Sequence, residues 1–196
     1  MAEMDTDRQI ETLEAELEDA RAEINQLRLQ LHVFTSTDAI TGLANRNGLL
    51  DSLQGAIDRQ QRMSEPYCVV FLRFPQLAGL FEAHHEDDYE EAVRHLGAIV
   101  AAGLRTVDRV GRLDETTFVA VLTNCPGEHI SIVIERSLSS IRALPLSVGA
   151  AEYALDPAVV ALLSGDEVAA GAEVVLSRGM QLIAEAAVGE DLVIGL

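Results

Sequence analysis

The segment Asp38–Arg46, which reads Asp-Ala-Ile-Thr-Gly-Leu-Ala-Asn-Arg, separates two parts of the chain with different patterns. Before it, residues 1–35 lack glycine and proline and repeat apolar side chains at helical spacing. The run Thr35–Thr37 contains residue types that commonly end one helix or cap the next. After the Thr-Gly-Leu turn, apolar side chains across Leu49–Ile57 predict a new helix. The sequence therefore predicts two domains, a helical one over 1–35 and a globular one over 36–196.

Residues 1–35 carry an uninterrupted heptad pattern, in which the first and fourth positions are apolar. The apolar seam consists of Ile10, Leu13, Leu17, Ala20, Ile24, Leu27, Leu31 and Phe34. The flanking positions, which pair between parallel chains, carry opposite charges at Glu16, Glu23, Arg21 and Arg28. We therefore predict a long helix that forms a parallel two-stranded coiled coil and holds a homodimer. The alternative is a lone amphipathic helix that folds back on its own domain.

Residues 36–196 alternate between apolar runs of strand length and amphipathic stretches of helix length. The predicted strands are Tyr67–Phe74, the hairpin of Arg109–Leu113 with Thr117–Leu122, Leu146–Tyr153 and Leu192–Ile194, and the predicted helices include Asp87–Leu104 and Ile130–Ile141. A long helical region, interrupted by Gly165 and Gly171, is expected before the last strand. This order predicts an α/β sandwich with a central mixed sheet flanked by helices.

The 196 residues carry a formal net charge of -18. That charge argues against a nucleic-acid polymer as partner, because such affinity comes mostly from neutralising phosphates. A small anionic ligand held by local arginines remains compatible with it. No apolar run is long enough to span a membrane and the N-terminus is acidic, so we expect neither membrane insertion nor a signal peptide. Cys68 and Cys125 lie within or beside apolar runs, which predicts buried thiols and a cytoplasmic protein.

The segment Asp38–Arg46 resembles the opening of a GGDEF domain, the diguanylate cyclase family. Arg112 and the strand Leu146–Gly149 also match the family pattern, and the resemblance covers roughly residues 36–196. It implies a nucleotidyl-cyclase-like fold for the globular domain. Where the family carries Gly-Gly-Asp-Glu-Phe, this chain reads Asp-Glu-Thr-Thr-Phe over Asp114–Phe118, so that only the phenylalanine is retained.

The resemblance implies that the catalytic positions have lost their chemistry. Family members hold magnesium ions with carboxylates and join GTP molecules. The corresponding positions here carry Arg73, Pro75, Thr116 and Thr117 in place of acidic residues, Phe81 and Glu90 at guanine-reading positions, and Ala186 where a phosphate-contacting lysine is common. We therefore expect a degenerate domain without cyclase activity, metal or cofactor. We also expect Arg73 to pair with Asp114 or Glu115 and so fill the former metal pocket.

A second set of positions matches the site at which many GGDEF domains bind their product, cyclic di-GMP. The segment Arg105-Thr106-Val107-Asp108 stands at the family's spacing before the degenerate signature. Counting along the chain places Arg136 at an arginine of the next helix and Arg59 at an arginine that a neighbouring protomer contributes. Arginine offers a planar fork to phosphate oxygens, and aspartate accepts hydrogen bonds from guanine. The resemblance thus implies cyclic di-GMP binding by Arg105, Asp108, Arg136 and Arg59.

Other interpretations of these residues stay open. Arg105 suits the C-terminus of a helix, Asp108 suits a turn, and Arg59 and Arg136 suit solvated helix positions. The protein is then a dimeric interaction scaffold with no nucleotide ligand. A third interpretation keeps the degenerate pocket as a weak sensor of GTP or GDP. In each case a protein partner is expected, and the sequence does not identify it.

Overall fold

The computed structural model describes Leu17, residues 35–165, residues 171–189 and residues 191–195. The chain divides into two compact units, Met1–Thr35 and Ser36–Leu196. The predicted coiled coil falls almost entirely outside the described residues. Within them, no helix is both long and apolar enough to cross a membrane.

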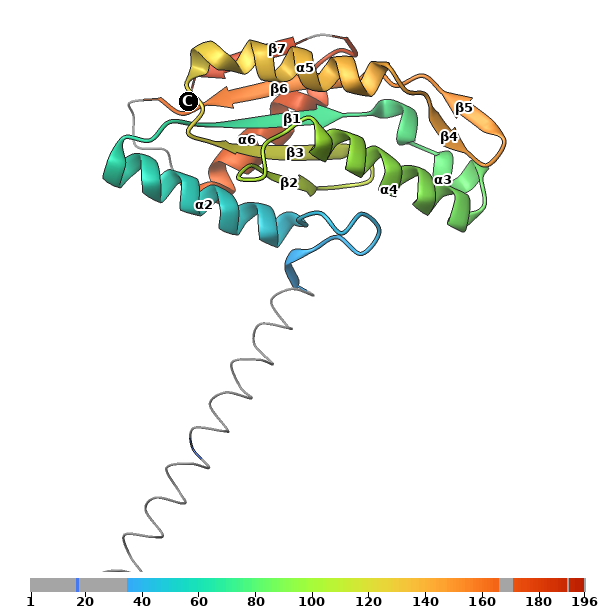
Figure 1. The fold of residues 1–196 in the computed structure, drawn as a ribbon, viewed down its shortest axis with the longest axis horizontal. Coiled ribbons are helices and arrows are strands. Elements are labelled where there is room, and N and C mark those ends of the chain that lie inside the picture. The colour runs from blue at the N-terminus through green and yellow to red at the C-terminus, as the bar shows by residue number, and fades with distance from the viewer. Residues whose placement is uncertain (1–16, 18–34, 166–170, 190, 196) are drawn as a thin grey trace, which may run out of the picture. The chain divides into compact units, whose positions relative to one another are not determined.

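A five-stranded sheet forms the centre of the second unit (Figure 1). Its strands, in spatial order, are β2 (Arg109–Arg112), β3 (Thr117–Thr123), β1 (Tyr67–Arg73), β6 (Ala158–Leu163) and β7 (Asp191–Gly195). The three neighbouring pairs from β2 to β6 are antiparallel, whereas β6 and β7 run parallel. The sheet is therefore mixed, as predicted.

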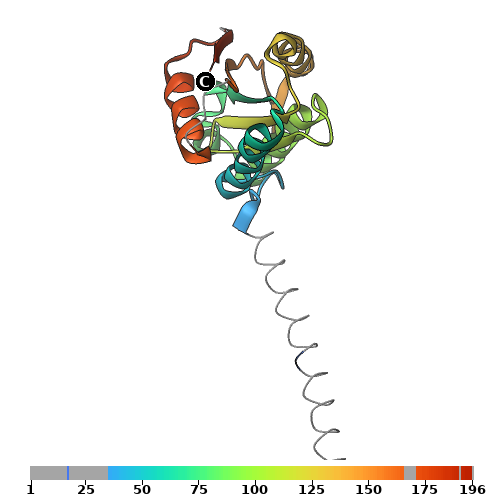
Figure 2. The same cartoon turned by 90° about the vertical axis from the view of Figure 1, so that its left-hand side faces the viewer.

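Helices cover both faces of the sheet, as Figure 2 shows with α6 on one side of the strands and α4 and α5 on the other. The main helices are α2 (Arg46–Met63), α4 (Glu86–Ala102), α5 (Ile130–Arg142) and α6 (Ala172–Glu185). Along β1, Val70 and Leu72 pack in the core beneath α4 and α5, whereas Val69 and Phe71 pack in the core beneath α2 and α6. Alternate side chains of a strand point to opposite faces, so a strand that is apolar up to its last residue fits between two helical layers.

Short elements complete the fold. They are a 3₁₀ turn at Pro75–Leu77, α3 (Leu80–Ala83), a 3₁₀ turn at Gly127–His129, and a separate hairpin of β4 (Leu146–Val148) with β5 (Ala151–Tyr153). Cys68 and Cys125 are free, buried thiols, as the sequence predicted.

Two sequence predictions of secondary structure were wrong. Leu146–Tyr153 is not one strand, because Gly149 adopts a left-handed backbone with φ of 57° and turns the chain between β4 and β5. The long helical region before the last strand contains β6, which pairs with β1. A short apolar run buried on both faces reads equally well as helix or strand from periodicity alone. The other strands and helices predicted between residues 46 and 195 are confirmed to within a few residues.

Gly179 of α6 offers a test of how the helix meets the sheet. A Cβ atom at this position would lie 2.0 Å from the ring of Phe71, which is fully buried. We expect Gly179→Ala to lower the free energy of unfolding by about 2 kcal/mol through overpacking. The control is Gly55→Ala in α2, where the nearest atom is the Arg59 guanidinium at 3.5 Å. That change should stabilise the domain by roughly 0.5 kcal/mol. Equal effects in urea unfolding would contradict this packing.

Candidate functional site

The site is framed by a turn at Asp38 that leads into α2. The backbone N–H and the hydroxyl of Thr41 both donate to Asp38 Oδ1, at 2.8 and 2.7 Å. Gly42 completes the turn with φ of 69°, a conformation that glycine adopts without strain. Asn45 then caps α2, since its side-chain oxygen accepts from the Gly48 N–H at 3.1 Å. These contacts explain why the residue types of this segment form a turn followed by a helix.

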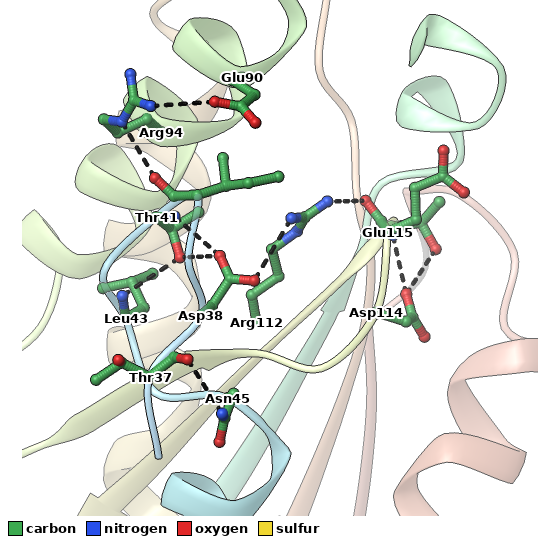
Figure 3. A network of polar contacts seen from close by, with 12 residues as sticks. Thr37, Asp38, Thr41, Leu43, Asn45, Glu90, Arg94, Arg112, Asp114 and Glu115 are labelled. Atoms are coloured by element: carbon green, nitrogen blue, oxygen red, sulfur yellow. Dashed lines mark hydrogen bonds and ion pairs between the residues drawn. The ribbon is translucent and has the colours of Figure 1, made fainter. Parts of the chain in front are cut away.

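The guanidinium of Arg112 joins this turn to the degenerate signature, as Figure 3 shows, and it also reaches α4. Arg112 is only 8% exposed and lies 3.7 Å from Asp38 Oδ2 as an ion pair. It donates to the hydroxyl of Tyr89 on α4 at 3.0 Å and to the backbone carbonyl of Glu115 at 3.4 Å. Burial raises the pKa of Tyr89, so the phenol stays neutral and accepts this hydrogen bond. One buried cation thus holds three separate segments together.

The degenerate signature forms a short hairpin loop whose polar groups are largely satisfied within it. The Leu113 N–H donates to the Thr117 carbonyl at 2.9 Å and closes the loop. Asp114 Oδ1 accepts from the backbone N–H and the hydroxyl of Thr116, at 2.9 and 3.2 Å. Thr117 is buried, while Asp114 and Glu115 are exposed. The Asp114 carboxylate therefore serves as a turn-forming group.

Arg73 lies beside the position that the signature threonines occupy. The register of β1 and β3 pairs Arg73 with Thr117, so the two positions that carry family carboxylates face each other across the sheet. Arg73 donates to the carbonyl of Ala186 at 2.8 Å. Ala186 is the C-cap of α6, and a cation there is favoured by the partial negative charge of the helix end. The predicted ion pair with Asp114 or Glu115 was therefore wrong, because the helix end competes for the guanidinium.

The residues at this place do not fit magnesium. Magnesium requires hard oxygen ligands, chiefly carboxylates, and the facing pair here consists of a guanidinium and a hydroxyl. Among the described residues, no group of three or more histidine, cysteine, aspartate or glutamate side chains is arranged to hold a metal ion.

Arg105 and Asp108 lie together in the loop between α4 and β2. Arg105 donates to the Asp108 carboxylate through its backbone N–H at 3.0 Å and through its guanidinium at 3.2 Å. The same guanidinium donates to the Thr123 carbonyl at 2.8 Å. The Asp108 side chain is 2% exposed, whereas that of Arg105 is 51% exposed. The predicted pair is therefore adjacent in space, with the aspartate turned toward its own arginine and the guanidinium half open to solvent.

Arg59 and Arg136 approach this loop from different elements. Arg59, on α2, lines a pocket of about 350 Å³ together with Asp51, Thr106, Asp108, Arg109 and Thr123. Arg136, on α5, donates to the Gly103 carbonyl at the end of α4, at 3.1 Å. Arg59 thus lines the same pocket as Asp108 within one chain.

Sequence reasoning missed Arg109 and Asp51 as members of this pocket. Arg109 is the first residue of β2 and directly follows Asp108, so its proximity was readable from the sequence. Asp51 comes from α2, and no sequence spacing relates it to the loop that precedes β2. Asp51 places an acidic group opposite the arginines of the pocket.

The buried network predicts a large difference between two arginines. Arg112→Met should lower the free energy of unfolding by about 3 kcal/mol, because it leaves Asp38 without its counter-charge in a mostly buried place. Arg94→Met is the matched control, since Arg94 forms an exposed ion pair with Glu90 at 3.6 Å. We expect a loss of less than about 1 kcal/mol there. Similar losses for both variants in urea unfolding would show that burial of Arg112 is not what matters.

Comparison with known proteins agrees with this fold. A family model described as "Diguanylate cyclase, GGDEF domain" matches residues 35–159. The chain is also 21% identical over 129 residues to the uncharacterized membrane protein YdaK of Bacillus subtilis (strain 168). That alignment covers 66% of this chain and 46% of YdaK, so the chain spans less than half the length of this relative.

Solved structures share the architecture. The diguanylate cyclase SiaD of Pseudomonas aeruginosa, in complex with its activator SiaC, superposes with a TM-score of 0.71 at 19% identity, over 95% of this chain and 72% of that one. The coiled coil and GGDEF domain of DgcB from Caulobacter crescentus, in complex with c-di-GMP, gives 0.71 at 16% identity, over 93% and 99%. The GGDEF domain of FimX from Pseudomonas aeruginosa gives 0.68 at 19%, over 82% and 99%.

At these identities the structural likeness shows the shared fold, and it confirms the GGDEF-type architecture expected from the sequence. The family model covers more than half of the chain and includes both the Asp38 turn and the hairpin that carries the degenerate signature. This chain therefore belongs to the GGDEF domain family.

Proposed function

We propose that this protein is a non-catalytic GGDEF signalling protein that binds cyclic di-GMP at the loop of Arg105 and Asp108. The observation that carries the proposal is a contrast between two places on one scaffold. Arginines gather around Asp108, which suits an anionic ligand, while Arg73 and Thr117 stand where the metal-binding carboxylates of a cyclase belong.

The absence of cyclase activity follows from electrostatics. Phosphoryl transfer depends almost entirely on positioning and on stabilising charge on the transferring phosphate, and magnesium supplies much of that stabilisation. A guanidinium fixed to the end of α6 repels a divalent cation at the ligand position. Exposed carboxylates at Asp114 and Glu115 repel a triphosphate from the other side.

Ligand binding is supported by the geometry around Asp108. The half-open guanidinium of Arg105 offers donors to phosphate oxygens, and Arg59 and Arg109 line the adjoining pocket. Its volume of about 350 Å³ lies at the lower end of the range for small-molecule sites. In a chain of net charge -18, a local concentration of arginines is the feature that attracts an anion.

The proposal includes a homodimer held by the parallel coiled coil of residues 1–35. The heptad seam and its flanking charges support it, as does the match over 93% of this chain to a DgcB structure that contains a coiled coil and a GGDEF domain. Cyclic di-GMP, binding as a stacked pair, bridges two domains and shifts their relative placement, which exposes or hides a surface for a protein partner. We assign this function to the cytoplasm, in keeping with two buried free thiols.

One observation favours the alternative of a scaffold without ligand. Both Arg105 and Asp108 are satisfied by contacts within the chain, including the bond from Arg105 to the Thr123 carbonyl. Arg136 likewise caps the end of α4. These contacts give Arg105, Asp108 and Arg136 a structural role that needs no ligand. Binding must therefore be measured directly.

Calorimetric titration of cyclic di-GMP into the full chain tests the proposal. We expect affinity in the micromolar range or tighter, and Arg59→Ala should weaken it about 30-fold, the equivalent of ~2 kcal/mol for a lost charged hydrogen bond. Substitution of Arg59 separates ligand binding from stability more clearly than substitution of Arg105. The ion pair of Arg59 with Glu65, at 3.8 Å, is partly exposed and contributes little to folding. Arg105→Ala should abolish binding.

Arg62→Ala is the matched control, because Arg62 lies on the same helix and donates to the backbone carbonyl of Asp58. It should bind as tightly as the wild type. No heat of binding from a folded wild-type protein would refute the receptor and leave the scaffold. If Arg62→Ala also lost binding, the result would contradict the placement of the ligand site in this pocket.

Incubation with GTP and magnesium tests the second half of the proposal. We expect no cyclic di-GMP in the product mixture after prolonged incubation at high protein concentration, because the facing pair Arg73 and Thr117 cannot hold the metal. Chromatography of the nucleotides checks this. Product that accumulates with time and disappears in Arg73→Ala would overturn the assignment as non-catalytic.

A further inference from the structure

The two edges of the central sheet differ among the described residues. At the β2 edge, the backbone of Ala44 forms a bridge to Gly111, donating to the Val110 carbonyl at 3.0 Å and accepting from the Arg112 N–H at 2.8 Å. At the opposite edge, β7 pairs with β6 on one side, and the described structure includes no strand on its other side. A strand edge with unpaired N–H and C=O groups is a template for pairing with another chain.

The side chains of β7 do not protect this edge. Leu192 and Val193 are 40% and 42% exposed. Natural proteins commonly guard free edges with lysine, proline or inward-pointing charges. The described part of β7 carries a single charge, at Asp191, and its remaining residues are apolar or glycine.

A groove lies next to this edge, on the face of the sheet that α5 covers. It has a volume of about 710 Å³ and is lined by residues of α5 and β7. Ile134, Leu138 and Val193 contribute apolar surface to it, and α5 presents the small side chains of Ser131 and Ser139. The edge is therefore accessible from this face through the groove.

We propose that β7 pairs antiparallel with β7 of a second copy of this chain, in a two-fold interface centred on Val193. A strand that meets its own copy about a two-fold axis repeats each contact, so its residues must be compatible with their symmetry partners. Centring on Val193 sets that residue against itself and Leu192 against Ile194 of the second copy. Apolar pairs directly opposite each other stabilise antiparallel strands.

The charges of the strand are compatible with this register. Asp191 falls opposite Gly195 of the second copy, so no like charges lie directly opposite each other within Asp191–Gly195. The formal net charge of -18 opposes the approach of a second copy, but at about 0.1 M salt the repulsion between charges more than about 10 Å apart is largely screened. The pairing extends the sheet across two domains, and it adds an interface that is independent of cyclic di-GMP binding.

Cysteine crosslinking of the full chain tests the interface and its register. In an antiparallel pair, directly opposite Cα atoms are about 4.5–5.5 Å apart, within the range that a disulfide bridges. Two copies of Val193→Cys should therefore crosslink readily with diamide as the oxidant. Leu192→Cys is the matched control, since its exposure is nearly the same. Its symmetry partner lies about 7–8 Å away, which is too far.

We expect Val193→Cys to crosslink at least about tenfold faster than Leu192→Cys, because pairing raises the effective concentration at one position only. Adding Leu192→Lys to the Val193→Cys chain should slow the reaction by a similar factor while circular dichroism stays unchanged. The native cysteines are buried, so the wild type should not crosslink.

Equal rates at both positions would overturn the proposal, because random collision does not distinguish neighbouring residues. Failure of both variants to crosslink, while their thiols still react with a small disulfide reagent, would also overturn it. The open edge would then be a site for a different protein.

Discussion

The buried ion pair between Arg112 and Asp38 is the interaction on which the rest of the domain depends. It fixes the turn that starts α2, reaches Tyr89 on α4 and holds the carbonyl of Glu115 in the degenerate loop. Burying a guanidinium costs free energy unless nearby acceptors and a counter-charge compensate. All three segments must therefore be in place when Arg112 is buried. Both the loop of Arg105 and Asp108 and the facing pair of Arg73 and Thr117 adjoin strands held in this frame, at opposite ends of the β2–β3 hairpin.

On that frame, Arg73 places a cation beside the hairpin that carries Asp114–Phe118. Arg73 stands at the end of β1 in the same register that a carboxylate would take, and its guanidinium caps α6 through Ala186. The guanidinium of Arg73 thus joins a strand to the end of a helix. Asp114 and Glu115 supply the acidic groups of the neighbouring hairpin loop, and Asp114 shapes that loop.

Much of the fold was predictable, because its signals are local. The Asp38–Arg46 turn, the β2–β3 hairpin and the helices α4 and α5 follow from turn residues and periodicity. The strand β6 was not predictable, because its pattern is apolar on both faces and its partner β1 is distant in sequence. Counting residues brought Arg105 and Asp108 to one loop, but it could not show which carbonyls their donors reach. Hydrogen bonds of this kind depend on how helices and strands pack against each other. The spacing of residues along the chain does not encode that packing.

Hydrogen exchange of the full chain with each nucleotide tests the central claim most directly, since it separates the two places on the scaffold. We predict that cyclic di-GMP slows amide exchange around Arg105–Asp108 and leaves Asp114–Thr117 unchanged. GTP with magnesium should slow exchange at neither place. Protection of Asp114–Thr117 by GTP and magnesium, with none around Arg105–Asp108 from cyclic di-GMP, would contradict the account.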